Sequence, residues 1–227
     1  ESAVRTLSRR IVRRGGTMLG DVVGLGKTLT AVATALMLQA AEDYSTLVLC
    51  PKNLEPMWTE HLEAYDINGR VVPYSMVDKV LPELKRFHLV ICDESHNLRN
   101  NGTIAYEAIH RYIRANGSKV LLLTATPYNL AFTDVANQIG LYIDEDDDLG
   151  IVPTEALRKD PALAGRVDGK INTLTAFRKS EEPEDWKRLM SDHLVRRTRS
   201  FIKRTAKKET ILGEDGTPEE REYLQFA

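Results

Sequence analysis

The chain has 227 residues, enough for one domain of ~100 to 200 residues and part of a second, but not for two large ones. Hydrophobic residues make up 42% and charged residues 28%, which excludes the compositions of disordered and collagen-like chains. The 31 Lys and Arg nearly balance the 33 Asp and Glu, so nucleic acid could be recognised only by a local basic surface.

Short apolar runs alternate with helical patterns over residues 1–141, as in a parallel sheet flanked by helices. The segments expected to form helices are 4–12, 28–41, 54–65 and 103–114. The expected strands are 17–20, 45–50, 70–75, 87–92 and 119–124. Several of these strands are apolar throughout, which is typical of strands covered on both faces. The sequence therefore predicts an α/β fold with a mostly parallel central sheet.

The pattern changes after residue 141. Scattered prolines and an acidic run at 144–148 accompany weak periodicity up to Glu184. The run lacks the glycine and spaced ligands of a calcium loop, so we interpret it as a solvated loop without chemistry. A helical stripe begins at Glu184 and is expected to extend through Arg197 to Phe201. Residues 196–208 hold seven basic side chains and no acidic one. The predicted division is a lobe at 1–141, an insertion or helical protrusion at 142–195 and a basic segment at 196–227.

Two features bear on the surroundings of the protein. The uncharged segment 28–41 is shorter than the ~20 apolar residues that a membrane-spanning helix needs, so we expect no membrane partner. Cys50 and Cys92 each end an apolar run, which indicates buried strand thiols and a reducing compartment. We expect the protein to be cytoplasmic and nucleoid-associated in a prokaryote, or nuclear in a eukaryote.

A glycine-rich turn, DVVGLGKT, lies between the first strand and the uncharged helix. Gly24 and Gly26 would let backbone N–H groups close around a phosphate chain at the positive end of the helix dipole. Lys27 would reach the β- and γ-phosphates, and the Thr28 hydroxyl would bind the Mg²⁺ ion that bridges them. Asp21 stands where the common phosphate loop has a glycine, so the turn by itself leaves open a flexible loop with a surface lysine.

Two further strands end in polar residues. FHLVIC is followed by Asp93 and Glu94, which would point into the ligand crevice at the carboxyl edge of a parallel sheet. Asp93 would hold Mg²⁺, usually through a water, and Glu94 would orient and deprotonate the attacking water. KVLLL is followed by Thr124 and Thr126, whose hydroxyls could bond these carboxylates or could serve only in the turn before a proline. The glycine turn and the acidic pair together predict a nucleotide hydrolase.

These motifs resemble the first motor lobe of the superfamily 2 helicase-like ATPases, and most closely the Swi/Snf branch of double-stranded DNA translocases. In that branch the first motif has an Asp, two residues and GLGKT, which matches Asp21 and places Leu25 in the nucleotide loop. PKNLEPMWTEHL is similar to the segment after the second strand, with Pro51 and Trp58 at the matching positions. DESHNLRN resembles the second motif with Ser95 in place of the usual alanine, LTATP resembles the third motif, and LVRRTRSFI the arginine-rich segment after the helical protrusion.

The resemblance implies a RecA-like P-loop lobe with a C-terminal helical protrusion. It implies ATP and Mg²⁺ as cofactors, with Lys27, Asp93 and Glu94 as catalytic residues. The residues that it implies for ATP binding are Asp21, Gly24, Leu25, Gly26, Lys27 and Thr28, and for Mg²⁺ Thr28 and Asp93. Those implied to couple the ATP site to DNA are His96, Thr124 and Thr126. Those implied to contact nucleic acid are Pro51, Lys52, Arg99 and Asn100.

The implied partners are duplex DNA and a second RecA-like lobe of the same parent chain, because no second phosphate-site or arginine-finger motif follows residue 140. The favoured function is thus the first lobe of a DNA-dependent ATPase that moves on duplex DNA, with little turnover as an isolated lobe. A strand-separating helicase acting on DNA or RNA shares all these residues. A non-catalytic nucleotide-binding adaptor is the third interpretation, although it would not require the complete set of Lys27, Thr28, Asp93 and Glu94.

Overall fold

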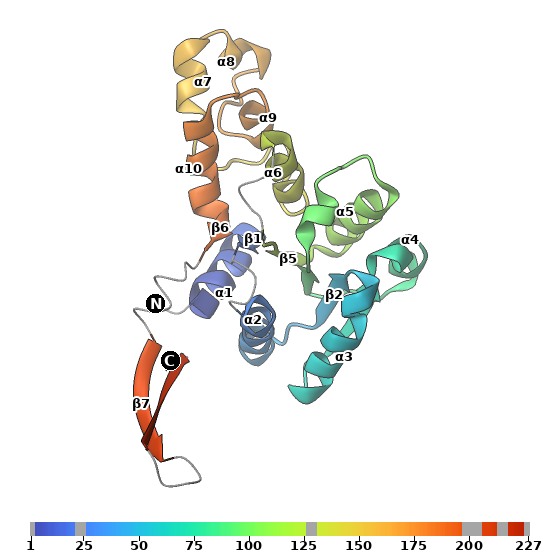
Figure 1. Ribbon diagram of the computed structural model, residues 1–227. Coiled ribbons are helices and arrows are strands. Elements are labelled where there is room, and N and C mark those ends of the chain that lie inside the picture. The colour runs from blue at the N-terminus through green and yellow to red at the C-terminus, as the bar shows by residue number, and fades with distance from the viewer. Residues whose placement is uncertain (1–2, 21–25, 126–130, 197–205, 213–217, 225–227) are drawn as a thin grey trace.

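The computed structural model describes residues 3–20, 26–125, 131–196, 206–212 and 218–224, the last two as backbone only. Its main body is a six-stranded sheet in the order β3-β2-β4-β5-β1-β6, in which every neighbouring pair is parallel (Figure 1). The strands of this sheet are β1 Gly16–Leu19, β2 Thr46–Cys50, β3 Gly69–Pro73, β4 Leu89–Cys92, β5 Lys119–Leu123 and β6 Leu194–Val195. The predicted RecA-like α/β lobe with a parallel sheet is confirmed.

Helices cover both faces of this sheet (Figure 1). They are α1 Ala3–Arg14, α2 Lys27–Glu42, α3 Glu55–Ala64, α4 Val77–Val80, α5 Ile104–Asn116, α6 Phe132–Ile139, α7 Thr154–Lys159, α8 Leu163–Arg166, α9 Leu174–Phe177 and α10 Pro183–His193. Short 3₁₀ turns are formed by Lys52–Leu54, Tyr74–Met76, Leu81–Glu83 and Ser95–Leu98. Two further strands, β7 Ala206–Leu212 and β8 Pro218–Leu224, pair antiparallel as a hairpin.

The apolar strands are buried on both faces, as their composition predicts. In β4, Leu89 and Ile91 pack against α1, α2 and α3, whereas Val90 and Cys92 pack on the side of α5, α6 and α10. This division follows from the alternation of side chains along a strand. All four residues are at most 1% exposed, so burial of strand side chains in two separate layers is the main apolar stabilisation of the lobe.

The two cysteines are free, buried strand residues, as expected. Burial, followed by the nearby charge of Asp93, raises the pKa of the Cys50 thiol to about 12 and raises that of Cys92 further. Both thiols therefore remain protonated at neutral pH and act as small apolar side chains. In the described part of the chain, no helix combines the length and apolar character that crossing a bilayer requires.

The prediction of a helix that runs from residue 184 through Arg197 to Phe201 is wrong at its C-terminal end. α10 stops at His193, and the chain then turns into β6, which pairs with the edge of β1. Polar groups from the N-terminal segment hold this transition: Thr17 Oγ1 donates to the His193 carbonyl at 2.9 Å and Arg10 Nη1 to the Leu194 carbonyl at 3.1 Å. These long-range bonds outweigh the local helical pattern. Arg197 and Phe201 themselves lie outside the described residues.

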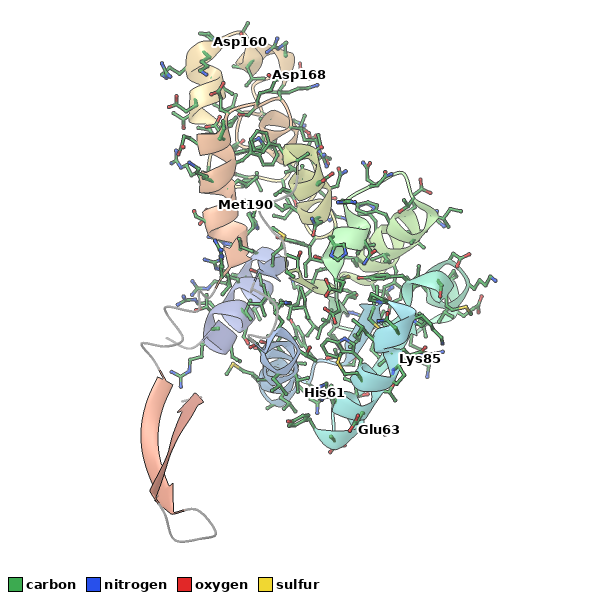
Figure 2. All side chains as sticks on the ribbon, viewed as in Figure 1. His61, Glu63, Lys85, Asp160, Asp168 and Met190 are labelled. Carbon is green, nitrogen blue, oxygen red and sulfur yellow. The ribbon has the colours of Figure 1, made fainter. Side chains whose placement is uncertain are left out.

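Residues 142–193 form a protrusion built from short helices. Figure 2 shows Asp160 and Asp168 at its far end and Met190 on α10, close to the sheet. A small cluster of buried residues holds it together, namely Ala156, Leu163, Val167 and Ala176. Asp185 is 2% exposed and ties α10 to the start of α7, because its carboxylate accepts the N–H groups of residues 155 and 156 at 2.9 and 3.0 Å and the Ser180 hydroxyl at 2.7 Å. The carboxylate satisfies donors that a helix start leaves unpaired.

The acidic run 144–148 is an exposed loop anchored by basic side chains. Its carboxylates form ion pairs with residues of other elements: Asp144 with Arg114 at 2.9 Å, Glu145 with Arg178 at 2.7 Å and Asp146 with Lys170 at 2.6 Å. Exposed pairs of this kind contribute ~0 to 1 kcal/mol each. They tie the loop to Arg114 of α5 and to Lys170 and Arg178 further along the protrusion, and the interpretation of the run as a loop without chemistry stays a prediction.

His193 is expected to make the stability of the lobe depend on pH. Its ring is 4% exposed and its Nδ1 lies 3.2 Å from the Tyr142 hydroxyl. Burial, together with the charges of Arg14 and Arg10, lowers the pKa of His193 to about 4 from 6.5. His193 therefore becomes protonated near pH 6.5 in the unfolded chain but only near pH 4 in the folded chain. The free energy of unfolding should fall as the pH drops through this window, by up to roughly 3 kcal/mol.

Urea denaturation at several pH values between 4 and 8 would measure this effect. His193→Gln removes the ionisable ring, so the difference in unfolding free energy between wild type and variant should shrink as the pH falls below 6.5. A difference that stays constant over this range would contradict the assignment. Carboxylates that titrate in the same window affect both chains alike and cancel in the comparison.

Candidate nucleotide site

The carboxyl ends of parallel strands meet at one edge of the sheet, which is where ligands bind in open α/β folds. Asp93 directly follows β4 and Thr124 directly follows β5, its neighbour in the sheet. β1, which leads to the glycine-rich turn, pairs with the other side of β5, and β2, which leads to Pro51, pairs with the other side of β4. The topology therefore brings the predicted strand-end residues to one edge.

The start of α2 has the backbone geometry expected after a phosphate-binding turn. Gly26 has φ 72° and ψ 39°, a left-handed conformation that favours glycine, and no atom of the described residues would crowd a Cβ there. Its carbonyl accepts both the N–H of Thr30 at 3.0 Å and the Thr30 hydroxyl at 2.9 Å. No side chain of the capping residue covers the helix start, and Lys27 and Thr28 form its first turn. Asp21, Gly24 and Leu25 lie outside the described residues.

Asp93 is 5% exposed and held from several directions. Its Oδ2 accepts the indole N–H of Trp58 at 2.8 Å, and its Oδ1 accepts the N–H of Glu94 at 2.8 Å. Its carbonyl accepts the Tyr74 hydroxyl at 2.7 Å, and its own N–H donates to the Leu49 carbonyl at 2.8 Å. These contacts fix both the main chain and the carboxylate plane, as a metal-binding group requires.

Glu94 has a different environment from its neighbour. Its backbone is left-handed, with φ 49° and ψ 51°, a conformation uncommon for a residue with a side chain and typical of functional sites. Its carbonyl accepts the N–H and the side-chain amide of Asn97 at 3.0 and 2.8 Å, which hold the turn. The Glu94 side chain is 32% exposed, so its carboxylate can reach water while that of Asp93 stays buried.

The predicted coupling residues are placed in part. Nδ1 of His96 lies 3.2 Å from Oε2 of Glu94, close enough for an ion pair if the ring is protonated, but without hydrogen-bond geometry. Thr124 is fully buried, and its N–H donates to the Leu19 carbonyl at 3.0 Å, which joins the ends of β5 and β1. Thr126 lies outside the described residues. His96 is thus beside the acidic pair, whereas the coupling role of all three residues stays a prediction.

The predicted nucleic-acid contacts lie on loops at the same edge. Lys52 is exposed and forms an ion pair with Glu55, one turn further on. Such a pair would be exchanged for a phosphate contact at small cost. Arg99 and Asn100 are also exposed. The Asn100 side chain accepts the N–H of Gly102 at 3.0 Å, so this residue serves at least to shape the loop.

Several contacts around the Asp93–Glu94 pair could not be predicted from sequence motifs. The Ser95 hydroxyl, which stands where an alanine is usual, donates to Oε1 of Gln138 on α6 at 2.8 Å, and both residues are fully buried. The contact of the Tyr74 hydroxyl with the Asp93 carbonyl was also not predicted, because nothing in the local sequence marks Tyr74 as a site residue. For Trp58 there was a usable signal, because a buried indole N–H needs a partner. The partner itself depends on the packing of α3 against β4 and not on sequence spacing.

The donor set fits Mg²⁺. Thr28 and Asp93 offer a hydroxyl and a carboxylate, the hard oxygen ligands that this ion prefers, with the remaining positions taken by phosphate oxygens and water. Within the described ranges, no three His, Cys, Asp or Glu side chains gather as a complete metal site.

No family model matches the sequence. Among curated proteins, the chain is 26% identical over 154 residues to the human DNA repair and recombination protein RAD54B, which covers 53% of this chain and 17% of RAD54B. It is 30% identical over 138 residues to the SWI/SNF-related matrix-associated actin-dependent regulator of chromatin subfamily A-like protein 1 of Bos taurus, which covers 52% of this chain and 14% of that protein. It is 27% identical over 158 residues to the ATP-dependent helicase YqhH of Bacillus subtilis, which covers 60% and 28%.

The fold is also similar to that of a solved structure. The SWI2/SNF2 ATPase core of Sulfolobus solfataricus, solved in complex with double-stranded DNA, superposes with a TM-score of 0.60 at 19% identity, covering 86% of this chain and 42% of that one. In sequence and in fold, the chain is thus similar to part of a SWI2/SNF2-type ATPase core. The chain spans less than a third of the length of each curated relative above.

Proposed function

We propose that this lobe binds Mg-ATP, hydrolyses it when completed by a second RecA-like lobe of the parent chain, and drives movement along duplex DNA. The observation that supports the proposal is the topology: β1, which precedes α2, and β4, which leads to the Asp93–Glu94 pair, lie on the two sides of β5, and all three parallel strands end at the same edge of the sheet. A helix start supplies N–H donors and a positive dipole end, and the acidic pair supplies one buried and one partly exposed carboxylate. Phosphoryl transfer to water needs these two kinds of group.

The roles of the residues follow from their environments. Lys27, in the first turn of α2, would bind the β- and γ-phosphates. Asp93, buried and immobilised, would hold Mg²⁺, which supplies charge neutralisation on those phosphates when bound. Glu94, with its accessible carboxylate, would orient the attacking water and take its proton. An arginine that stabilises the transition state would come from the second lobe, so the lobe alone should turn over slowly.

Two observations support duplex DNA as the partner. The structural relative from Sulfolobus solfataricus was solved with double-stranded DNA. The exposed residues Lys52, Arg99 and Asn100 lie on loops after β2 and β4, on the edge that carries the acidic pair. Lys and Arg side chains on such loops would bind phosphates without sequence preference and with strong dependence on salt.

ATP hydrolysis by the parent chain, measured without nucleic acid and with duplex DNA, single-stranded DNA or RNA, tests this proposal. We expect stimulation by duplex DNA that weakens as the salt concentration rises. Stimulation by RNA or single strands instead would favour the strand-separating helicase. Absence of hydrolysis under all four conditions would favour a nucleotide-binding adaptor.

A further inference from the structure

Trp58 connects α3 to the acidic pair through its indole ring. The side chain is fully buried, in the apolar layer formed by α1, α2 and α3. Its Nε1 lies 2.8 Å from Oδ2 of Asp93. The other carboxylate oxygen of Asp93 accepts the N–H of Glu94 at 2.8 Å. Each oxygen of this carboxylate therefore has one fixed donor, and the two donors together set its rotation about the side-chain bonds.

The second tryptophan of the chain provides a comparison. Trp186 is 3% exposed, and its Nε1 donates to the Ser180 carbonyl at 2.9 Å. Both indoles are thus buried and paired, as buried tryptophans usually are. Only the partner differs, because Trp186 meets a neutral main-chain group in the protrusion whereas Trp58 meets the carboxylate that ends β4. A hydrogen bond to a carboxylate is stronger than one to a neutral carbonyl and holds the acceptor more firmly.

We propose that Trp58 is a positioning residue of the nucleotide site: its N–H holds the Asp93 carboxylate in the orientation that receives Mg²⁺ with the nucleotide. This inference rests on the proposed function. A carboxylate has about four lone-pair positions, so the bonds from Trp58 and Glu94 leave capacity on both oxygens for a metal-bound water. Preorganisation of this kind lowers the cost of binding the ion. Trp58 does not touch the nucleotide and acts only through Asp93.

The test is the affinity of the full chain for a fluorescent ATP analogue, measured with Mg²⁺ and with EDTA. In Trp58→Phe, which keeps an aromatic ring but loses the donor, we expect the advantage that Mg²⁺ gives to nucleotide affinity to fall by roughly tenfold. Affinity in EDTA should stay as in wild type. Trp186→Phe is the matched control, since it also loses one buried indole hydrogen bond, and its Mg²⁺ advantage should be unchanged.

The outcomes separate the inference from the proposed function. An unchanged Mg²⁺ advantage in Trp58→Phe, or an equal loss of affinity with and without Mg²⁺, would overturn the positioning role while the nucleotide site stands. A wild-type chain that gains no affinity from Mg²⁺ would overturn both. A loss in the Trp186→Phe control as large as in Trp58→Phe would show a general effect of core damage and would also count against the positioning role.

A second measurement leaves Trp58 in place, so it does not depend on the folding of Trp58→Phe. The 227-residue chain has two tryptophans, so in Trp186→Phe the tryptophan emission, excited at wavelengths that tyrosine does not absorb, comes from Trp58 alone. We expect this emission to change when nucleotide is added with Mg²⁺ and to stay constant when it is added with EDTA. The same chain carrying Asp93→Ala should give no response. An emission that ignores Mg²⁺ and nucleotide together would overturn the positioning role.

Discussion

The parent chain carrying Glu94→Gln is expected to hydrolyse ATP about 100 to 10,000 times more slowly than wild type, the usual contribution of a general base. Glutamine keeps the size of the side chain but cannot take a proton from water. The variant should still bind ATP, because in the proposed mechanism Glu94 acts on the water and not on the phosphates. Steady-state hydrolysis and nucleotide affinity, measured side by side, check both halves of this expectation.

The contacts that hold the Glu94 backbone do not depend on its carboxylate, so Glu94→Gln should leave the local structure unchanged. The left-handed backbone is held through the Glu94 carbonyl by Asn97 and through the Glu94 N–H by Asp93, and neither contact involves the carboxylate that changes. Glu60→Gln, on the exposed side of α3, is the matched control and should hydrolyse ATP as wild type does. Hydrolysis by Glu94→Gln within a few-fold of wild type would remove Glu94 from the role of base.

The sheet could be predicted because its strands carry local signals. In the segment that forms β4, an unbroken apolar run followed by Asp93 and Glu94 indicates both a doubly covered strand and its functional end. The same pattern at β2 and β5 gives three neighbouring strands, and the glycine turn after β1 adds the fourth. Because parallel strands share one edge, the approximate position of the candidate site follows from these strand ends alone.

The remaining structure depends on contacts between distant parts of the chain. The helical pattern after residue 184 gives no reason to stop at His193, because the pairing of β6 with β1 and the bonds from Thr17 and Arg10 come from the other end of the sequence. The bond between Trp58 and Asp93 joins residues 35 positions apart for the same reason.

α6 could have been predicted from its sequence, but it is not among the helices that the sequence analysis expects. Its apolar residues Phe132, Val135, Ala136 and Ile139 have helical spacing. The helix is only eight residues long and follows the LTATP motif, where turn residues dominate the local pattern. Its buried Gln138, the partner of Ser95, also interrupts the apolar composition expected of a core helix.

Lys27→Ala is expected to weaken ATP binding by about 100-fold, equivalent to ~2.7 kcal/mol, because it removes the side chain placed to neutralise the β- and γ-phosphates. The substitution should leave the fold intact, since alanine is the best helix former and position 27 lies in the first turn of α2. Binding of a fluorescent ATP analogue to the wild-type and variant chains, in the presence of Mg²⁺, measures the change.

Lys85→Ala is the control for a general loss of positive charge. Lys85 is exposed and precedes the amino end of β4 (Figure 2), so it lies toward the edge of the sheet opposite Asp93. Its removal changes the net charge by the same amount as Lys27→Ala. Nucleotide affinity should nevertheless stay within about twofold of wild type. Exposed charges farther apart than ~8 to 10 Å are largely screened at physiological salt. Equal affinities in wild type, Lys27→Ala and Lys85→Ala would place the nucleotide elsewhere than at the start of α2. A loss confined to Lys27→Ala would identify the helix start as the phosphate site, and the hydrolysis defect of Glu94→Gln could then be assigned to the chemical step.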